Sequence, residues 1–256
     1  MSKSKPISTP ASKGQSLSKI MCCQNETKIL EIETVPYAQV VGSLMYALTS
    51  TRPYICHTVG LVSRYQSNPR KEHWQVVKRI SKYLQGTKKM GLYFGLGDLN
   101  IAWFIGANFA RDVDDMKSTS CYVFLFEGTT VSWFSKKQNC IAKSIMEAKY
   151  ISCSTAVCNA VWIKCFIKSI NFGMPNGPVN VFYDNKFAIS LITSGAQSSK
   201  GKDIDISYHY IQDIMERCEI KVELIPSLEM EVDPMTKWLF LDKFRVHVAK
   251  MGLRNT

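Results

Sequence analysis

The chain has 256 residues, of which 46% are hydrophobic and 21% are charged, and its 32 Lys and Arg residues outnumber its 21 Asp and Glu residues. This composition is typical of a globular protein with one large domain or two smaller ones. No apolar run approaches the roughly 18 residues that span a bilayer, and no apolar core follows the basic N-terminus, so we expect neither a membrane partner nor a secretory signal.

The nine cysteines indicate free thiols rather than a disulfide framework. Cys22 and Cys23 are adjacent, and no pair has the C-x-x-C spacing of a structural zinc site. We therefore expect an intracellular protein, either cytoplasmic or nuclear.

The first part of the chain predicts a leader followed by helices. Residues 1–20 are rich in Ser, Lys and Pro, so we expect a disordered leader there. Apolar residues then recur at intervals of three and four, which predicts helices at 37–50, 55–65 and 69–86. Thr51-Arg52-Pro53 separates the first two of these helices.

Positive charge is concentrated in this helical part. Residues 37–97 hold nine Lys and Arg residues and one acidic residue, Glu72, which is a net charge of +8. Such a segment attracts polyanions, and nucleic-acid phosphate is the first candidate. A solvated helical surface is the alternative.

The second part of the chain alternates strands and helices. Strands are expected at 101–109 and in two runs within 120–135 that join at Glu127-Gly128. The further elements expected are a helix at 141–170, a strand at 179–184 with a helix behind it, a helix near 208–217, a strand at 220–226 and a closing helix. This order predicts an α/β fold with a mixed five-stranded sheet and flanking helices, preceded by a small helical segment. Three tryptophans within these patterns are expected in the core: Trp103, Trp133 and Trp162.

Three acidic residues stand at the boundaries of these elements. Glu147 lies in the first turns of the long helix, Asp184 ends a strand, and Asp233 precedes the last helix. If the fold brings them together, a divalent cation such as Mg²⁺ would neutralise them and activate water for phosphodiester cleavage. The alternative is that they are unrelated capping or surface acids, since Asp184 in particular suits a helix cap.

Six stretches of the sequence resemble, in order and in approximate spacing, the C-terminal part of copia-type retrotransposon polyproteins. They are VPYAQVVGSLMYALTSTRPYI, SRYQSNPRKEHWQVVKRISKYLQGT, RDVDDMKSTSCYVF, IAKSIMEAKYISC, FYDNKFAI and VDPMTK. On this resemblance, residues 21–97 correspond to a remnant of the reverse transcriptase tail and residues 98–256 to an RNase H domain. The resemblance implies an RNase H-like fold that cleaves the RNA strand of RNA/DNA hybrids with Mg²⁺ or Mn²⁺.

The same resemblance assigns roles to the three acids and reveals a missing one. Glu147, Asp184 and Asp233 match the catalytic, metal-binding carboxylates of the family. The family also carries two aspartates on its first strand, where this chain has Gly106 and Asn108. A glycine supplies no ligand and an amide carries no charge, so we expect the metal to bind weakly if at all and cleavage to be impaired.

Further departures lie close to these motifs. Lys149 stands where an acid is common in the family, and Asp203 stands in place of a histidine before the late helix. Asp112, Asp114 and Asp115 follow the first strand. They align with turn positions of the family, so we do not expect them to replace the missing acid.

A nucleic acid is the expected partner, either an RNA/DNA hybrid or another form. Six residues near the strand ends are candidates for phosphate contacts: Lys117, Ser118, Thr119, Lys136, Lys137 and Gln138. The alternative is that they are solvated turn residues. For the whole chain, two alternatives to an RNase H stay open: a catalytically inactive nucleic-acid-binding module and a non-functional relic of a truncated element.

Overall fold

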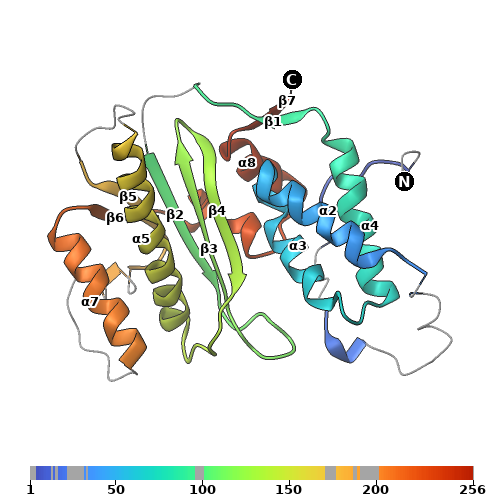
Figure 1. The fold of residues 1–256 in the computed structure, drawn as a ribbon, viewed down its shortest axis with the longest axis horizontal. Coiled ribbons are helices and arrows are strands. Elements are labelled where there is room, and N and C mark those ends of the chain that lie inside the picture. Colours follow the sequence, from blue (N-terminus) through green and yellow to red (C-terminus); the bar gives the residue numbers. More distant parts are fainter. Residues whose placement is uncertain are drawn as a thin grey trace.

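The computed structural model describes residues 4–12, 14, 17–21, 32, 34–95, 101–170, 177–186, 189–190 and 202–255. A mixed five-stranded sheet lies at its centre (Figure 1). Its strands are β2 (Ile101–Asn108), β3 (Thr119–Phe126), β4 (Thr129–Lys137), β5 (Val179–Tyr183) and β6 (Ile220–Leu224). The order is β4-β3-β2-β5-β6, with β2, β3 and β4 antiparallel and with β5 parallel to both β2 and β6. The predicted mixed five-stranded sheet is confirmed, in the order and directions of an RNase H-like fold.

The hairpin between β3 and β4 turns where the sequence predicts it. Glu127 and Gly128 form the two-residue turn and have φ values of 51° and 71°. Two successive positive φ values define the tight hairpin turn that matches the twist of antiparallel strands. Glycine adopts this conformation without strain, which explains the Glu-Gly pair at this position.

Helices cover both faces of the sheet (Figure 1). On one face lie α5 (Ile145–Ser169) and α7 (Lys202–Glu216), packed over Trp103, Ile105 and Tyr183. The other face, with Phe104 and Val123, is covered by helices of the N-terminal segment and by the last helix. These helices are α2 (Tyr37–Ser50), α3 (Cys56–Val62), α4 (Lys71–Gly86) and α8 (Leu241–Lys250). Residues of β2 therefore alternate between two separate cores, as the period of two in a strand requires.

Short elements complete the fold. The 3₁₀ helices are η1 (Lys19–Met21), η2 (Pro53–Ile55), η3 (Ser63–Tyr65), η4 (Ser227–Glu229) and η5 (Asp233–Met235). A second, two-stranded sheet pairs β1 (Met90–Leu92) with β7 (Leu253–Asn255). The cysteines within the described ranges are all free thiols.

The predicted helical segment is confirmed, and it shares a core with the sheet. Val41 and Ile80 from this segment belong to the same buried cluster as Val123 and Met235. The predicted domain boundary near residue 97 stays a prediction, but the packing of the described residues crosses it.

Several residues within the predicted leader contact the rest of the protein. Arg79 donates a hydrogen bond to Thr9 Oγ1 (2.9 Å), and Ser18 Oγ donates one to Asp114 Oδ1 (2.6 Å). Leu17 is buried in the cluster under the helical segment. The described parts of residues 4–20 are therefore anchored to α4 and to the turn after β2.

Helix α5 differs from its prediction in its start and in its buried face. It begins at Ile145, because Ser144 Oγ accepts a hydrogen bond from the Glu147 N–H and caps the first turn. Trp162 is 64% exposed, so its predicted core position is wrong, and it stacks instead on Phe166 with ring centroids 5.6 Å apart. Helix α5 carries apolar side chains on most of its sides, so the spacing of its apolar residues does not identify the buried face. Its length and composition would also suit a membrane span, but one side packs on β2 and β3.

A buried acid after β6 gives the fold a predicted pH dependence. Burial raises the pKa of Glu231 to about 7, and its Oε2 has no hydrogen-bond partner among the described residues. Because this folded-state pKa lies above the usual value of 4.5, the folded protein binds more protons than the unfolded chain between about pH 4.5 and pH 7, and stability falls as the pH rises through that range.

We expect Glu231→Gln to remove much of this loss. Its urea midpoint should exceed that of the wild type near pH 8 and approach it near pH 5. Glu229→Gln, at an exposed position two residues away, is the matched control and should leave the pH dependence unchanged. If both variants keep the wild-type pH profile, another group is responsible for it.

Candidate active site

The strand-end carboxylate Asp184 is paired with a lysine. It directly follows β5, and Lys149 Nζ from α5 lies 2.6 Å from its Oδ1. Lys149 is only 11% exposed, and the Tyr183 hydroxyl donates a hydrogen bond to its backbone oxygen (2.5 Å). Ser227 Oγ donates a longer bond to Asp184 Oδ2 (3.4 Å). An ammonium thus neutralises the carboxylate that the resemblance assigns to a metal.

The two other predicted carboxylates also have partners within the chain. Glu147 Oε2 accepts a hydrogen bond from the backbone N–H of Lys143, the residue before the N-cap of α5 (2.8 Å). Asp233 opens η5 and pairs with Lys237 Nζ at 2.8 Å. Lys237 follows Asp233 by four residues, so the spacing of the two residues was a sequence signal for this pair.

Gly106, where the resemblance predicts a first-strand acid, has no room for a side chain. A Cβ on Gly106 would lie 2.7 Å from Val232 Cγ2 and 3.0 Å from Cys121 Sγ. The backbone oxygen of Gly106 accepts a hydrogen bond from Ser152 Oγ (2.6 Å), which fixes β2 against α5. Two residues on, Asn108 Nδ2 donates to the Thr236 backbone oxygen (2.7 Å).

These residues do not fit the two-metal site that the resemblance implies. Within the described ranges, no three His, Cys, Asp or Glu side chains are placed to share a metal ion. Two of the predicted ligands, Asp184 and Asp233, are neutralised by lysines, and the third, Glu147, accepts a hydrogen bond from the Lys143 backbone N–H. The position that would bridge two ions holds Gly106, closed by Val232. We therefore derive no catalytic step through a metal.

The pairing of Lys149 with Asp184 makes a testable prediction. Lys149→Met leaves a largely shielded carboxylate without its cation, which we expect to cost roughly 1–3 kcal/mol of unfolding free energy. Asp184→Asn added to Lys149→Met should recover part of that loss, because no unpaired charge remains. Urea unfolding of the two single variants and the double variant measures the coupling energy between Lys149 and Asp184. Strictly additive changes in unfolding free energy would contradict the predicted coupling.

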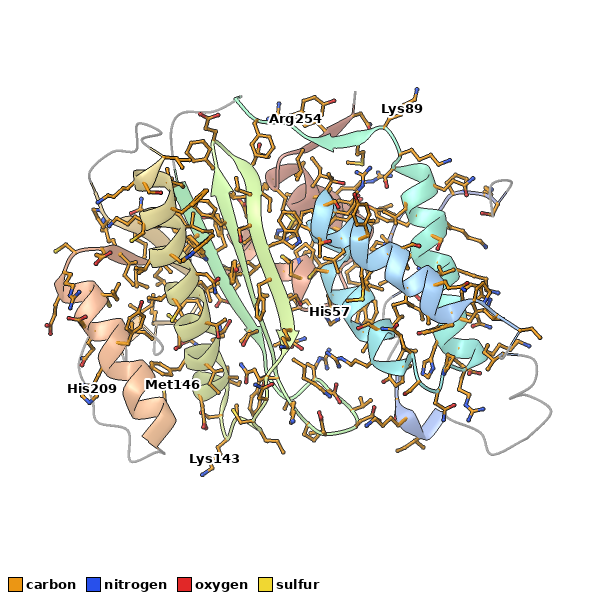
Figure 2. The ribbon with its side chains drawn as sticks, viewed as in Figure 1. His57, Lys89, Lys143, Met146, His209 and Arg254 are labelled. Carbon is orange, nitrogen blue, oxygen red and sulfur yellow. The ribbon has the colours of Figure 1, made fainter. Side chains whose placement is uncertain are left out.

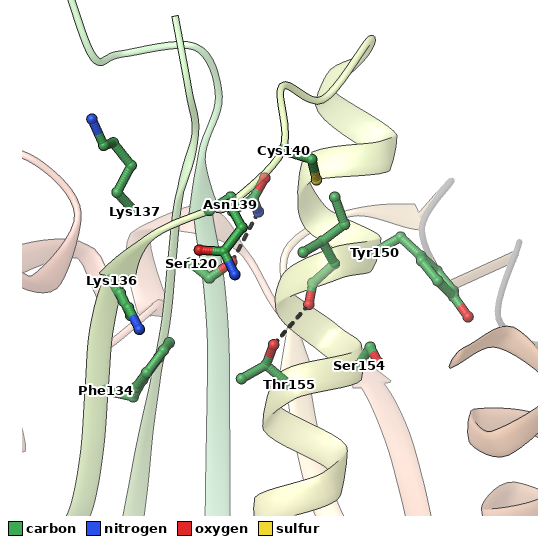
Figure 3. Close-up of a pocket in the computed structure, with 11 residues that line it drawn as sticks. Ser120, Phe134, Lys136, Lys137, Asn139, Cys140, Tyr150, Ser154 and Thr155 are labelled. Atoms are coloured by element: carbon green, nitrogen blue, oxygen red, sulfur yellow. Dashed lines mark hydrogen bonds between the residues drawn. The ribbon is translucent and has the colours of Figure 1, made fainter. Parts of the chain in front are cut away.

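Most of the predicted phosphate contacts are used inside the protein. Ser118, Thr119 and Gln138 are buried, and Gln138 Nε2 donates hydrogen bonds to Ser120 Oγ and Ala148 O. Lys137 forms ion pairs with two acids of the turn after β2, and Lys117 Nζ lies 4.0 Å from one of them, Asp115. The exposed Lys136 remains, at the edge of a cavity between β4 and α5 that Phe134, Asn139 and Ser154 also line (Figure 3). The contribution of the six residues to nucleic-acid binding stays a prediction.

The acidic turn between β2 and β3 connects three parts of the fold. The largely buried Asp112 forms an ion pair with Arg64, from η3, and lies 3.3 Å from Lys137 Nζ of β4. Asp114 accepts hydrogen bonds from the Lys19 backbone N–H (2.9 Å) and from the Tyr65 hydroxyl (3.3 Å). These acids hold the helical segment against the sheet, so they have a structural role in place of the missing ligand.

No family model matches the chain. The retrovirus-related Pol polyprotein from transposon TNT 1-94 of Nicotiana tabacum is 37% identical over 255 residues, which cover 100% of this chain and 19% of that protein. The corresponding polyprotein from transposon RE1 of Arabidopsis thaliana is 31% identical over 250 residues, with 97% and 16% covered. Secreted RxLR effector protein 161 of Plasmopara viticola is 41% identical over 133 residues, with 52% and 94% covered. The chain thus spans less than a fifth of the two polyproteins.

Solved structures of RNase H proteins are also similar, at low identity. The N-terminal RNase H domain of rv2228c from Mycobacterium tuberculosis is 13% identical and covers 59% of this chain and 98% of its own, with a TM-score of 0.39. LC11-RNase H1 in complex with an RNA/DNA hybrid is 15% identical, covers 51% and 88%, and has a TM-score of 0.34. At these scores the fold assignment rests on the strand order and directions of the sheet.

Proposed function

The chain belongs, as one segment, to the copia-type retrotransposon Pol polyproteins and carries an RNase H-like sheet, and we propose that it is a nucleic-acid-binding module whose cleavage of RNA/DNA hybrids is impaired. It would bind the hybrid, or another nucleic acid, through backbone phosphates inside the cell. The whole polyproteins are several times longer, so polymerisation is no part of this proposal.

The proposal rests on one observation: there is no space for a side chain at Gly106. In the two-metal mechanism that the resemblance implies, a carboxylate on the first strand is needed to hold both ions. Here the space for it is filled by Val232 and Cys121, and lysines neutralise Asp184 and Asp233. A fold without its site does not perform the chemistry of its relatives.

The charge of the helical segment supports binding. Residues 37–97 carry a net charge of +8, and lysines such as Lys71 and Lys88 are exposed on and just after α4. Phosphate contacts of this kind release counterions, so the affinity should fall steeply as the salt concentration rises.

A labelled RNA/DNA hybrid tests both halves of the proposal. We expect the wild-type protein to bind it in a salt-dependent manner and to leave the RNA strand intact in Mg²⁺ and in Mn²⁺. Asp184→Asn controls for a contaminating nuclease. Cleavage by the wild type that this variant abolishes would show a working active site. The absence of any binding at low salt would instead favour a non-functional relic.

A further inference from the structure

A cavity of about 410 Å³ lies where helix α3 and the carboxyl end of strand β2 meet. Its lining comes from α3 and η3, from the turn after β2 and from the residues that follow η5. Figure 2 shows His57 at this junction between the helical segment and the sheet. The cavity therefore exists only when the two parts pack together, and its volume is in the range of small-ligand pockets.

Positive charge dominates the lining. Arg111 is exposed and has no hydrogen-bond or ion-pair partner among the described residues. Lys237, 44% exposed, pairs with Asp233 through its ammonium group, which has three N–H donors. The acid of the lining, Asp112, is already neutralised by Arg64 and Lys137. The cavity thus offers free donors to an anion.

An uncharged aromatic wall stands beside these cations. The Trp238 and His57 rings meet edge to face, with centroids 5.4 Å apart and planes at 72°. Burial, with a smaller effect of Arg64, lowers the pKa of His57 to about 4, so the imidazole is neutral at pH 7. A wall of aromatic rings next to phosphate-binding cations matches the two halves of a nucleotide.

Asn108 fixes the position of this wall. Its Nδ2 donates to the backbone oxygen of Thr236, the residue before Lys237 and Trp238. A carboxylate has no N–H to donate, so the aspartate of the family would repel this carbonyl oxygen. Asn108 stands where the resemblance predicts a metal-binding aspartate. Its side-chain amide instead connects β2 to the residues that line the cavity.

We propose that this cavity binds one nucleotide of a nucleic-acid strand. Arg111 and Lys237 hold a backbone phosphate, Trp238 stacks on the base, and Asn108 is the positioning residue for Lys237 and Trp238. The inference rests on the proposed function and adds to it the place where a strand is held.

Fluorescence anisotropy with a labelled RNA/DNA hybrid, and with each labelled strand alone, tests the site over a series of salt concentrations. Arg111→Ala should raise the Kd roughly tenfold. It should also make the plot of log binding constant against log salt concentration less steep, by about one unit of slope. Arg254→Ala removes another exposed arginine, in β7 at the top of the view in Figure 2, and should change neither quantity.

Two further variants separate the roles. Trp238→Leu should weaken binding while the salt slope stays that of the wild type, because a stacked base releases no counterion. Asn108→Asp should weaken binding in the same experiment by displacing the wall. If Arg111→Ala and Arg254→Ala behave alike, the cavity is not the site, although the proposed function stands. If the wild type binds none of the probes, the proposed function fails as well.

Discussion

We expect a Gly106→Asp variant to unfold at a lower urea concentration than the wild type and not to cleave RNA/DNA hybrids. The added Cβ would lie 2.7 Å from Val232 Cγ2, closer than real Cβ atoms come to a neighbour, so the Val232 side chain, β2 or the segment after β6 must shift. Overpacking of this kind costs about 1–3 kcal/mol. Restoring the acid of the family at one position therefore destabilises the protein without building a metal site.

A second substitution separates the steric effect from the chemical one. Gly106→Ala should carry most of the steric cost, since it adds the same Cβ without a charge. Val232→Ala combined with Gly106→Asp should regain stability, because it removes the methyl group that the Cβ would meet. Urea unfolding measures the stability, and a hybrid cleavage assay in Mg²⁺ measures the activity. If Gly106→Asp is as stable as the wild type, the residues around Val232 move to accommodate the new side chain at little cost in unfolding free energy.

Asp112→Asn should destabilise the protein more than any other single loss of an acid in the turn after β2. Asp112 is 7% exposed and pairs with Arg64 and Lys137, so an amide in its place leaves Arg64 without this counterion, whereas Lys137 keeps Asp115. Breaking a fully buried pair costs about 3–5 kcal/mol, but both cations keep some contact with water, so we expect roughly 2–3 kcal/mol.

The neighbouring Asp115 is the matched control. It also pairs with Lys137, at 2.8 Å, but it is 35% exposed. Solvent screens such a pair, so Asp115→Asn should cost less than about 1 kcal/mol. Thermal unfolding compares the two, with a shift of about 2–4 °C expected for each kcal/mol in a chain of this size. Equal shifts for the two variants would contradict a special role of Asp112 in holding the helical segment.

Local patterns were sufficient to predict much of the fold. Strand β2 and the hairpin at Glu127-Gly128 follow from apolar runs and turn chemistry within a few residues of each other. The error at Trp162 has a physical reason, because a helix that is apolar on most sides does not show which side the sheet covers. Only the packing of α5 on β2 and β3 decides that, and this packing depends on distant parts of the chain.

The site depended on long-range contacts that no local pattern contains. The resemblance predicted acids at Gly106, Asn108 and Lys149, where this chain has none. It did not show that Lys149 reaches Asp184, 35 residues away, or that Asn108 binds the backbone of Thr236, 128 residues away. Arg111 and Trp238 were missed for the same reason, since only the folded chain brings both to one cavity.

The pairing of β1 with β7 has a consequence for how this region can be divided. A fragment starting at residue 98, where the sequence suggests a domain border, would leave Leu253–Asn255 as an unpaired edge and would keep only α8 and its neighbours over the face of the sheet that contains Phe104 and Val123. Such a fragment is expected to aggregate when expressed alone. The N-terminal helical segment thus has a structural role, because it packs on one face of the sheet.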